Sequence, residues 1–281
     1  MTNSGAASTM STIAIAQGTV VSTDGTVLAY QRLGSGAPLV VCHGSFSVAG
    51  DWRRFGEAMA TKRTVYLYDR RGRGLSQLAA SEFALDAEVD DLAAIMALAG
   101  PGAALLGHSF GGGCALSFAQ RESFTGPLIL YEPRHSTRVP VSRGHIPELQ
   151  RLIDAGDQDA AMAFALTHVV GLPSEAVAGM RQSPMWKALS RTIGAFPKEL
   201  RLLDSLAWRP GDLDTIAGPV SLLIGEQSPV LPDAVSPDVA LQELLPGLRK
   251  RVIPGEGHLA YASSPALLAD IVCCCLTGGE D

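Results

Sequence analysis

The sequence predicts an α/β protein with a mostly parallel, eight-stranded sheet, helices on both faces and an inserted helical cap. Short apolar runs of strand length alternate with helical patterns at both ends of the chain, as in a parallel sheet covered by helices. Between residues 134 and 218 the alternation stops, and only helical periodicity is present. We therefore predict a core made of residues 1–133 and 219–281, with a helical cap at residues 134–218.

Composition narrows the class of protein. The chain has 281 residues, of which 47% are hydrophobic and 18% charged, so it can bury a large core. The net charge of −6 and 22 scattered basic residues predict no nucleic-acid partner. The five cysteines show neither a disulfide framework nor a zinc spacing. With no signal peptide and no membrane-length apolar run, the chain is predicted to be cytoplasmic and to bind no membrane.

Local patterns place the individual elements. The fold opens with an antiparallel pair of strands around residues 12–22 and 26–32, joined at Asp24-Gly25, which favours a hairpin turn. Continuous apolar runs predict further strands at residues 38–42, 64–68, 103–106, 127–131, 219–224 and 250–253. Helices are predicted in the core at 48–59, 85–97, 238–245 and 265–276, and in the cap at 146–152, 158–169, 174–181, 185–193 and 198–206.

The segment from Gly107 to Gly111, Gly-His-Ser-Phe-Gly, carries the main chemical signal. It lies between an apolar strand and a helix rich in Ala and Gly, where small residues leave room for a sharp strand-to-helix turn. Such a turn lifts the Ser109 hydroxyl out of the sheet, towards the start of the helix. There the backbone N–H of Phe110 and the helix dipole favour an oxyanion.

Three more motifs follow other predicted strands: His43-Gly44, the run Asp69–Ser76, and Gly255-Glu256-Gly257-His258. With the turn at Ser109, these motifs occur in the order typical of the α/β-hydrolase superfamily, which the chain resembles over nearly its whole length. The resemblance implies the α/β-hydrolase fold, with Ser109 as the nucleophile and His258 as the general base.

The same resemblance implies an oxyanion hole formed by the N–H groups of Phe110 and Ser45. Phe46 is the alternative to Ser45 as the second donor, because loop geometry decides between them. His43 and His108, each beside a Gly at a strand terminus, are interpreted as hydrogen-bonded scaffold residues.

The acid of the expected triad departs from the commonest pattern. Similar chains carry an Asp shortly after the first strand beyond the cap, but this chain has Ser228 there. A neutral hydroxyl cannot stabilise an imidazolium as a carboxylate does. Glu132 ends the strand after the helix that follows Ser109, and some branches of the superfamily keep the acid at that position. We predict Glu132 as the acid, with Glu226 and Asp233 as alternatives.

The implied chemistry is acyl transfer by a serine hydrolase, through an acyl-enzyme and without metal or organic cofactor. The predicted partner is a small-molecule substrate, namely a small or medium apolar ester, thioester or lactone, and the sequence leaves open whether the protein is a monomer or a homodimer. Phe46 and Trp186 are predicted to line the pocket, under apolar cap residues such as Met162 and Met185. Carbon–carbon bond hydrolysis, cofactor-free perhydrolysis, and a non-hydrolytic, cyclase-like or ligand-binding role remain open.

Overall fold

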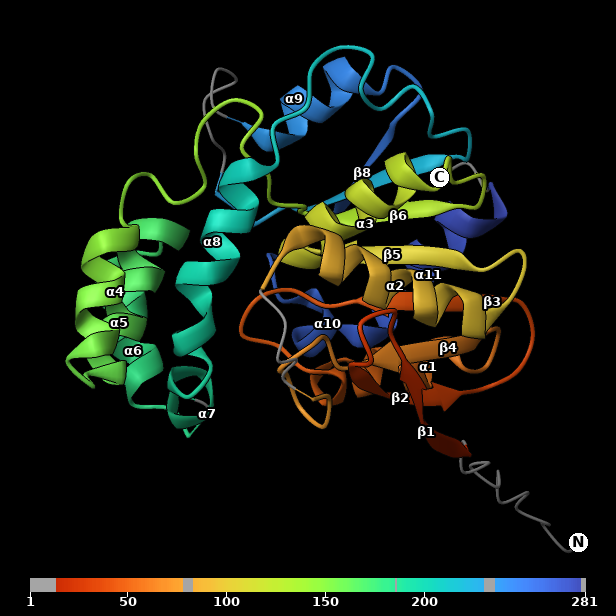
Figure 1. Cartoon of the computed structure of the whole chain (residues 1–281). Helices are drawn as coiled ribbons and strands as arrows, with labels where there is room; N and C mark the ends of the chain where they lie inside the picture. The colour runs from red at the N-terminus through yellow and green to blue at the C-terminus, as the bar shows by residue number, and fades with distance from the viewer. Residues whose placement is uncertain (1–13, 78–82, 185, 230–235, 279–281) are drawn as a thin grey trace, which may run out of the picture.

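The structure is a computed structural model, and it describes residues 14–77, 83–184, 186–229 and 236–278. Its strands are β1 (Ile15–Val21), β2 (Val27–Leu33), β3 (Pro38–Cys42), β4 (Thr64–Tyr68), β5 (Ala104–His108), β6 (Leu128–Tyr131), β7 (Val220–Gly225) and β8 (Arg249–Ile253). The eight strands in the described part form one sheet in the order β1-β2-β4-β3-β5-β6-β7-β8 (Figure 1). Only the pairs β1/β2 and β2/β4 are antiparallel, so the predicted mostly parallel sheet is confirmed.

The antiparallel opening of the sheet is made by the predicted hairpin. Gly25 has a φ of 85°, and the side chain of Asp24 accepts a hydrogen bond of 3.0 Å from the N–H of Thr26. Strand β1 begins at Ile15, and residues 12 and 13 of the predicted first strand lie outside the described residues.

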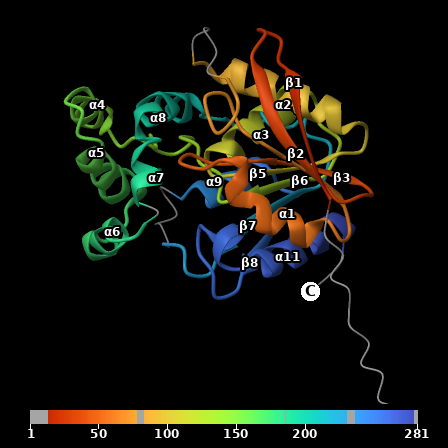
Figure 2. The same cartoon turned by 90° about the horizontal axis from the view of Figure 1, so that it is seen from below.

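Helices cover both faces of the sheet, which explains the continuous apolar runs of its central strands. Helices α1 (Arg53–Met59) and α11 (Pro265–Thr277) lie on one face, and α2 (Leu85–Ala99) and α3 (Phe110–Arg121) on the other (Figure 2). Neighbouring residues of β5 divide between the faces: Leu106 packs in the cluster with α1 and α11, and Leu105 in the cluster with α2 and α3.

The segment between β6 and β7, residues 134–218, is called the helical insertion below. Its elements are α4 (Ile146–Asp154), α5 (Gln158–Phe164), the π-helix η2 (Ala165–Val170), α6 (Ser174–Arg181), α7 (Trp186–Ser190), the 3-10 helix η3 (Ile193–Ala195) and α8 (Phe196–Ser205). Its described residues contain no strand. Figures 1 and 2 show these helices grouped beside the sheet, with α8 next to the core.

The other helices lie in loops at the sheet's edge or beside it. They are the 3-10 helix η1 (Ala49–Trp52), α9 (Pro237–Leu244) and the short α10 (Ala260–Ser263). Among the described residues, no helix combines the length and the apolar character needed to span a membrane.

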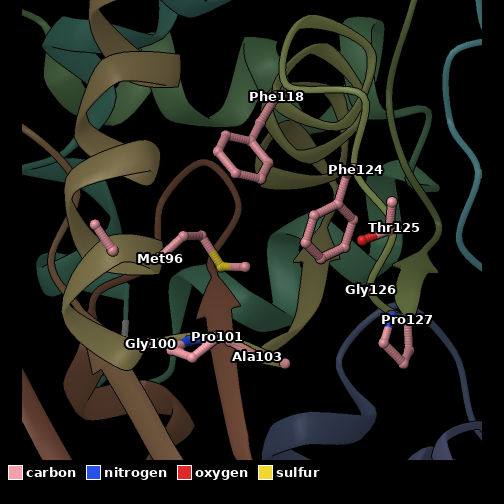
Figure 3. A pocket seen from close by; sticks show the side chains of 11 residues that line it. Met96, Gly100, Pro101, Ala103, Phe118, Phe124, Thr125, Gly126 and Pro127 are labelled. Carbon is pink, nitrogen blue, oxygen red and sulfur yellow. The ribbon is translucent and has the colours of Figure 1, made fainter.

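An open hollow of about 660 Å³ lies where β5 and β6 begin (Figure 3). Its lining includes Met96, Ala103, Phe118, Phe124 and Pro127. This hollow lies at the N-terminal ends of these strands, whereas Ser109 follows the C-terminal end of β5. The hollow is therefore not part of the candidate site.

Candidate active site

Ser109 lies at the turn between β5 and α3. Its backbone has φ 54° and ψ −118°, a strained conformation for a residue with a side chain. A Cβ on Gly111 would lie 2.2 Å from the carbonyl oxygen of Cys42, and one on Gly107 would lie 2.6 Å from the Cβ of Ala115. The glycines on both sides of Ser109 are therefore required by the close packing of α3 against the sheet.

The two predicted oxyanion donors are Phe110, directly after this serine, and Ser45, in a loop that approaches it. Phe110 is the first residue of α3, and Ser45 lies in the loop after β3. That loop is in contact with the turn, because a Cβ on Gly44 would come within 2.9 Å of the Cβ of Ser109. Within the described part of the chain, neither the N–H of Phe110 nor that of Ser45 donates a hydrogen bond.

Glu132 and His258 are brought together from the ends of β6 and β8. Oε2 of Glu132 lies 2.6 Å from Nδ1 of His258. Since a carboxylate only accepts, Nδ1 carries the hydrogen and Nε2 is left for another partner. The side chain of His258 is 30% exposed and that of Glu132 only 6%, so the ring is reachable while the carboxylate is shielded.

The second oxygen of Glu132 is also satisfied. Oε1 accepts hydrogen bonds from the N–H of Gly225, at 2.9 Å, and from the hydroxyl of Ser228. Burial favours the neutral acid, but the hydrogen bond and charge of His258, together with Ser228 and Gly225, lower the pKa of the Glu132 carboxyl below its usual range. Glu132 is therefore ionised at neutral pH, opposite the imidazole.

Two residues hold the loop that carries His258. Nε2 of His108 lies 3.0 Å from the carbonyl oxygen of His258, and the two rings are 4.5 Å apart. The hydroxyl of Tyr131 donates to the carbonyl oxygen of Gly257 and accepts from the N–H of Ala260 at 3.1 Å. These bonds keep His258 beside the residue that precedes Ser109. Sequence reasoning missed Tyr131, whose only signal was its place at the end of β6.

The two histidines interpreted as scaffold are buried and held neutral. Burial and the nearby charge of Arg70 lower the pKa of His43 to about 3, and its Nε2 accepts from the N–H of Arg70 at 3.2 Å. Burial and the proximity of His258 lower the pKa of His108 well below its usual value.

The structure pairs Glu226 and Trp186 with residues other than Glu132 and His258. Glu226 is exposed and its Oε2 accepts from the N–H of Gly255 at 2.6 Å. Trp186 is buried in the helical insertion, where its indole N–H donates to Asp159 at 2.6 Å. Asp233 and Met185 lie outside the described residues.

Phe46, in the loop after β3, is in contact with the helical insertion. Its φ is 61°, and its ring packs 4.4 Å from that of Phe196, the first residue of α8.

The described residues include no group of three or more His, Cys, Asp or Glu side chains placed to hold a metal ion.

A mostly parallel sheet with a serine at a strand-to-helix elbow, beside a carboxylate-bound histidine, is the architecture of a hydrolase. A sequence profile of the alpha/beta hydrolase family matches residues 39–271. The chain belongs to this family.

Related proteins agree with this assignment. An alpha/beta hydrolase from Sphaerobacter thermophilus DSM 20745 superposes with a TM-score of 0.79 and 30% sequence identity, over 91% of this chain and 98% of that one. A thermophilic esterase from Thermogutta terrifontis has the same fold, with a TM-score of 0.70 and 22% identity over 95% and 100% of the chains. An uncharacterized protein of Mycobacterium tuberculosis H37Rv is 25% identical in an alignment that covers 87% of this chain and 76% of that protein.

Proposed function

We propose that the protein is a serine hydrolase that cleaves a small or medium apolar ester, thioester or lactone. The observation that carries the proposal is the 2.6 Å contact between Nδ1 of His258 and Oε2 of Glu132, beside the strained turn that presents Ser109. Ser109, Glu132 and His258 follow one another along the chain in the order nucleophile, acid and base, as in other hydrolases with this kind of elbow.

In the proposed reaction His258 takes the hydroxyl proton of Ser109 at Nε2, and the oxygen of Ser109 attacks the acyl carbon. The negative charge that develops on the carbonyl oxygen is met by the N–H groups of Phe110 and Ser45. The imidazolium is stabilised by the ionised carboxylate of Glu132, and it then protonates the leaving group. Water, activated by His258, releases the acyl group and restores Ser109.

We further propose that the helical insertion is the cap of this site, and that Phe46 contributes to the substrate pocket. The contact of Phe46 with Phe196 supports both assignments, because it joins the loop that carries Ser45 to α8. Trp186 stays a proposed pocket residue. Its bond to Asp159 within the insertion supports an indirect role in shaping the pocket, since the indole is 7% exposed.

The test is a burst-phase assay with p-nitrophenyl acetate and butyrate, together with labelling by a fluorophosphonate probe. Wild type should show a burst and turnover, and the probe should label Ser109. Ser109→Ala should give neither signal. Glu132→Gln should lower kcat by about 100-fold or more, because the imidazolium loses its counter-charge.

A wild-type protein that folds, as judged by circular dichroism, but neither turns over these esters nor reacts with the probe would refute the proposal. If Glu132→Gln has the kcat of wild type, the proposal of a serine hydrolase stands, but Glu132 is not the acid of its triad.

A further inference from the structure

Four charged side chains form a buried cluster next to the proposed oxyanion hole. Nη2 of Arg70 lies 2.8 Å from Glu88 and 2.9 Å from Glu199, and Nη2 of Arg73 lies 2.8 Å from the same Oε1 of Glu199. The side chains of Arg70, Glu88 and Glu199 are fully buried, and that of Arg73 is 5% exposed. Two positive and two negative charges thus balance without help from solvent.

The helical insertion contributes one member of this cluster, Glu199 of α8. Within the core, Glu88 of α2 already binds Arg70 through both of its oxygens, with Nε at 3.1 Å and Nη2 at 2.8 Å. Burial opposes ionisation of Glu199, but the charges of Arg73 and Arg70 lower its pKa to about 2. A buried charge carries a desolvation cost. Glu199 therefore neutralises Arg73 and adds a second ion pair to Arg70, which Glu88 of the core already binds.

Arg70 is in contact with both halves of the proposed oxyanion hole. Its Nη1 donates to the carbonyl oxygen of Gly44 at 3.4 Å, in the residue before Ser45. Its guanidinium lies 4.0 Å from the ring centroid of Phe110, the residue that supplies the other donor. A shift of this guanidinium would therefore change the positions of the backbone N–H groups of both Ser45 and Phe110.

Helix α8 contacts the same loop at two further points. The rings of Phe196 and Phe46 pack 4.4 Å apart, and Phe46 holds a φ of 61° that needs support from its surroundings. Ser45 is close enough to the Glu199 carboxyl to lower its pKa, while the buried Oε2 of Glu199 has no hydrogen bond of good geometry in the described structure.

We propose that Glu199 is a positioning residue for the oxyanion hole. Through its ion pairs, Glu199 couples the packing of α8 against the core to the position of the Gly44–Phe46 loop. The inference rests on the proposed hydrolase function for its catalytic consequence. In this arrangement the hole is complete only while α8 is seated, because the ion pairs and the ring contact form together.

The experiment compares Glu199→Gln with Asp91→Asn, which removes a buried carboxylate from the neighbouring ion pair of Arg71. That pair lies within the core and contains no residue of α8. Measurements are kcat, KM, the rate of fluorophosphonate labelling, and hydrogen–deuterium exchange of a peptide covering residues 43–47. Phe196→Leu removes the ring contact and leaves the charges, so it serves if Glu199→Gln fails to fold.

Glu199→Gln and Phe196→Leu should lower kcat and the labelling rate by about 10-fold, less than the loss of a whole oxyanion donor, with KM within about 2-fold. Exchange at residues 43–47 should become faster. Asp91→Asn should lose thermal stability but stay within about 2-fold of wild type in kcat, with unchanged exchange at residues 43–47.

Equal effects of Glu199→Gln and Asp91→Asn on kcat and exchange would overturn the proposal, as would full kcat in both variants of α8. If wild type is inert towards esters and probe, the hydrolase proposal fails, and exchange alone then decides the coupling. Faster exchange at residues 43–47 in the α8 variants alone would support the coupling between α8 and this loop. Equal exchange in all variants would refute that coupling.

Discussion

The hydroxyl of Ser228 donates a hydrogen bond to Oε1 of Glu132, while the other oxygen of that carboxylate accepts from His258. Ser228 stands where the resemblance to the α/β-hydrolase superfamily implies an acid. The side chain at that position therefore donates a hydrogen bond to the proposed acid, which follows the neighbouring strand β6.

Replacing Ser228 by Ala should weaken catalysis without abolishing it. The variant loses one of the hydrogen bonds that hold Glu132 ionised, whereas the bond from Gly225 remains. We expect kcat/KM to fall about 5- to 20-fold, which corresponds to roughly 1–2 kcal/mol. The matched control is Ser205→Ala, which removes a hydroxyl bound to the carbonyl oxygen of Leu202. Equal kinetics of the two variants would contradict the role given to Ser228.

An acid restored at the commoner position should rescue an enzyme without Glu132. The double variant Glu132→Gln/Ser228→Asp carries a carboxylate on the loop after β7, next to the original place of the Glu132 oxygens. We expect it to regain at least about 10-fold in kcat over Glu132→Gln alone. The single variant Ser228→Asp should be less active than wild type, because two adjacent carboxylates raise each other's pKa. No gain in the double variant would show that only the β6 position can reach His258.

Two helical glycines should respond to alanine in opposite ways. Gly111→Ala drives a Cβ to 2.2 Å from the carbonyl oxygen of Cys42, in backbone that cannot easily yield, and should cost about 3 kcal/mol or more. A Cβ on Gly179, in α6, would meet no atom within 4 Å, so Gly179→Ala should stabilise by about 0.5–1 kcal/mol. Urea unfolding followed by circular dichroism measures both. A Gly111→Ala protein as stable as wild type would contradict the close approach of α3 to β3.

Acid should destabilise the protein through its buried histidines. Burial lowers the pKa of His43 to about 3 and that of His135 to about 4, both from 6.5. Below pH 6.5, His43 and His135 therefore bind protons in the unfolded chain but stay neutral in the folded protein. The two groups together should reduce the free energy of unfolding by about 2.4 kcal/mol per pH unit between pH 6 and 5.

The measurement is urea unfolding at pH 8, 6 and 5. His135→Gln should reduce the loss per pH unit by about half of that sum, relative to its own stability at pH 8. A wild-type stability that stays constant down to pH 5 would contradict neutral burial of both rings.

Local patterns predicted most of the core because the same residues that form each element also bury it. Strands β3 and β4 match their predicted bounds, since each is a continuous apolar run buried on both faces. The short helix α10 was missed, because four residues carry no periodicity. A continuous helix over residues 158–169 was predicted, whereas α5 passes into the π-helix η2, which ends at Val170, before Gly171 with φ 85°.

The candidate site was predictable where a motif fixes the backbone, and not where distant side chains meet. The turn at Ser109 and the ends of β6 and β8 placed Ser109, Glu132 and His258 at one edge of the sheet. The contact of Arg70 with Glu199 joins residues 129 positions apart, and no local pattern specifies it. The bond from Ser228 to Glu132 was missed for the same reason: the sequence marked Ser228 as a missing acid and could not show where its hydroxyl points.

The placement of Glu132 on β6 has a consequence for how such a site can evolve. Strands β5 and β6 are direct neighbours, paired from Leu105/Leu128 to His108/Tyr131. One strand–helix–strand unit, residues 104–132, therefore carries the proposed nucleophile, one oxyanion donor and the acid in a register set by backbone hydrogen bonds. The base, His258, and the second proposed oxyanion donor, Ser45, come from other segments. The loop after β7 then supplies a hydrogen bond from Ser228 instead of the charge, so changes elsewhere in that loop can reshape substrate preference while the reacting groups stay in place.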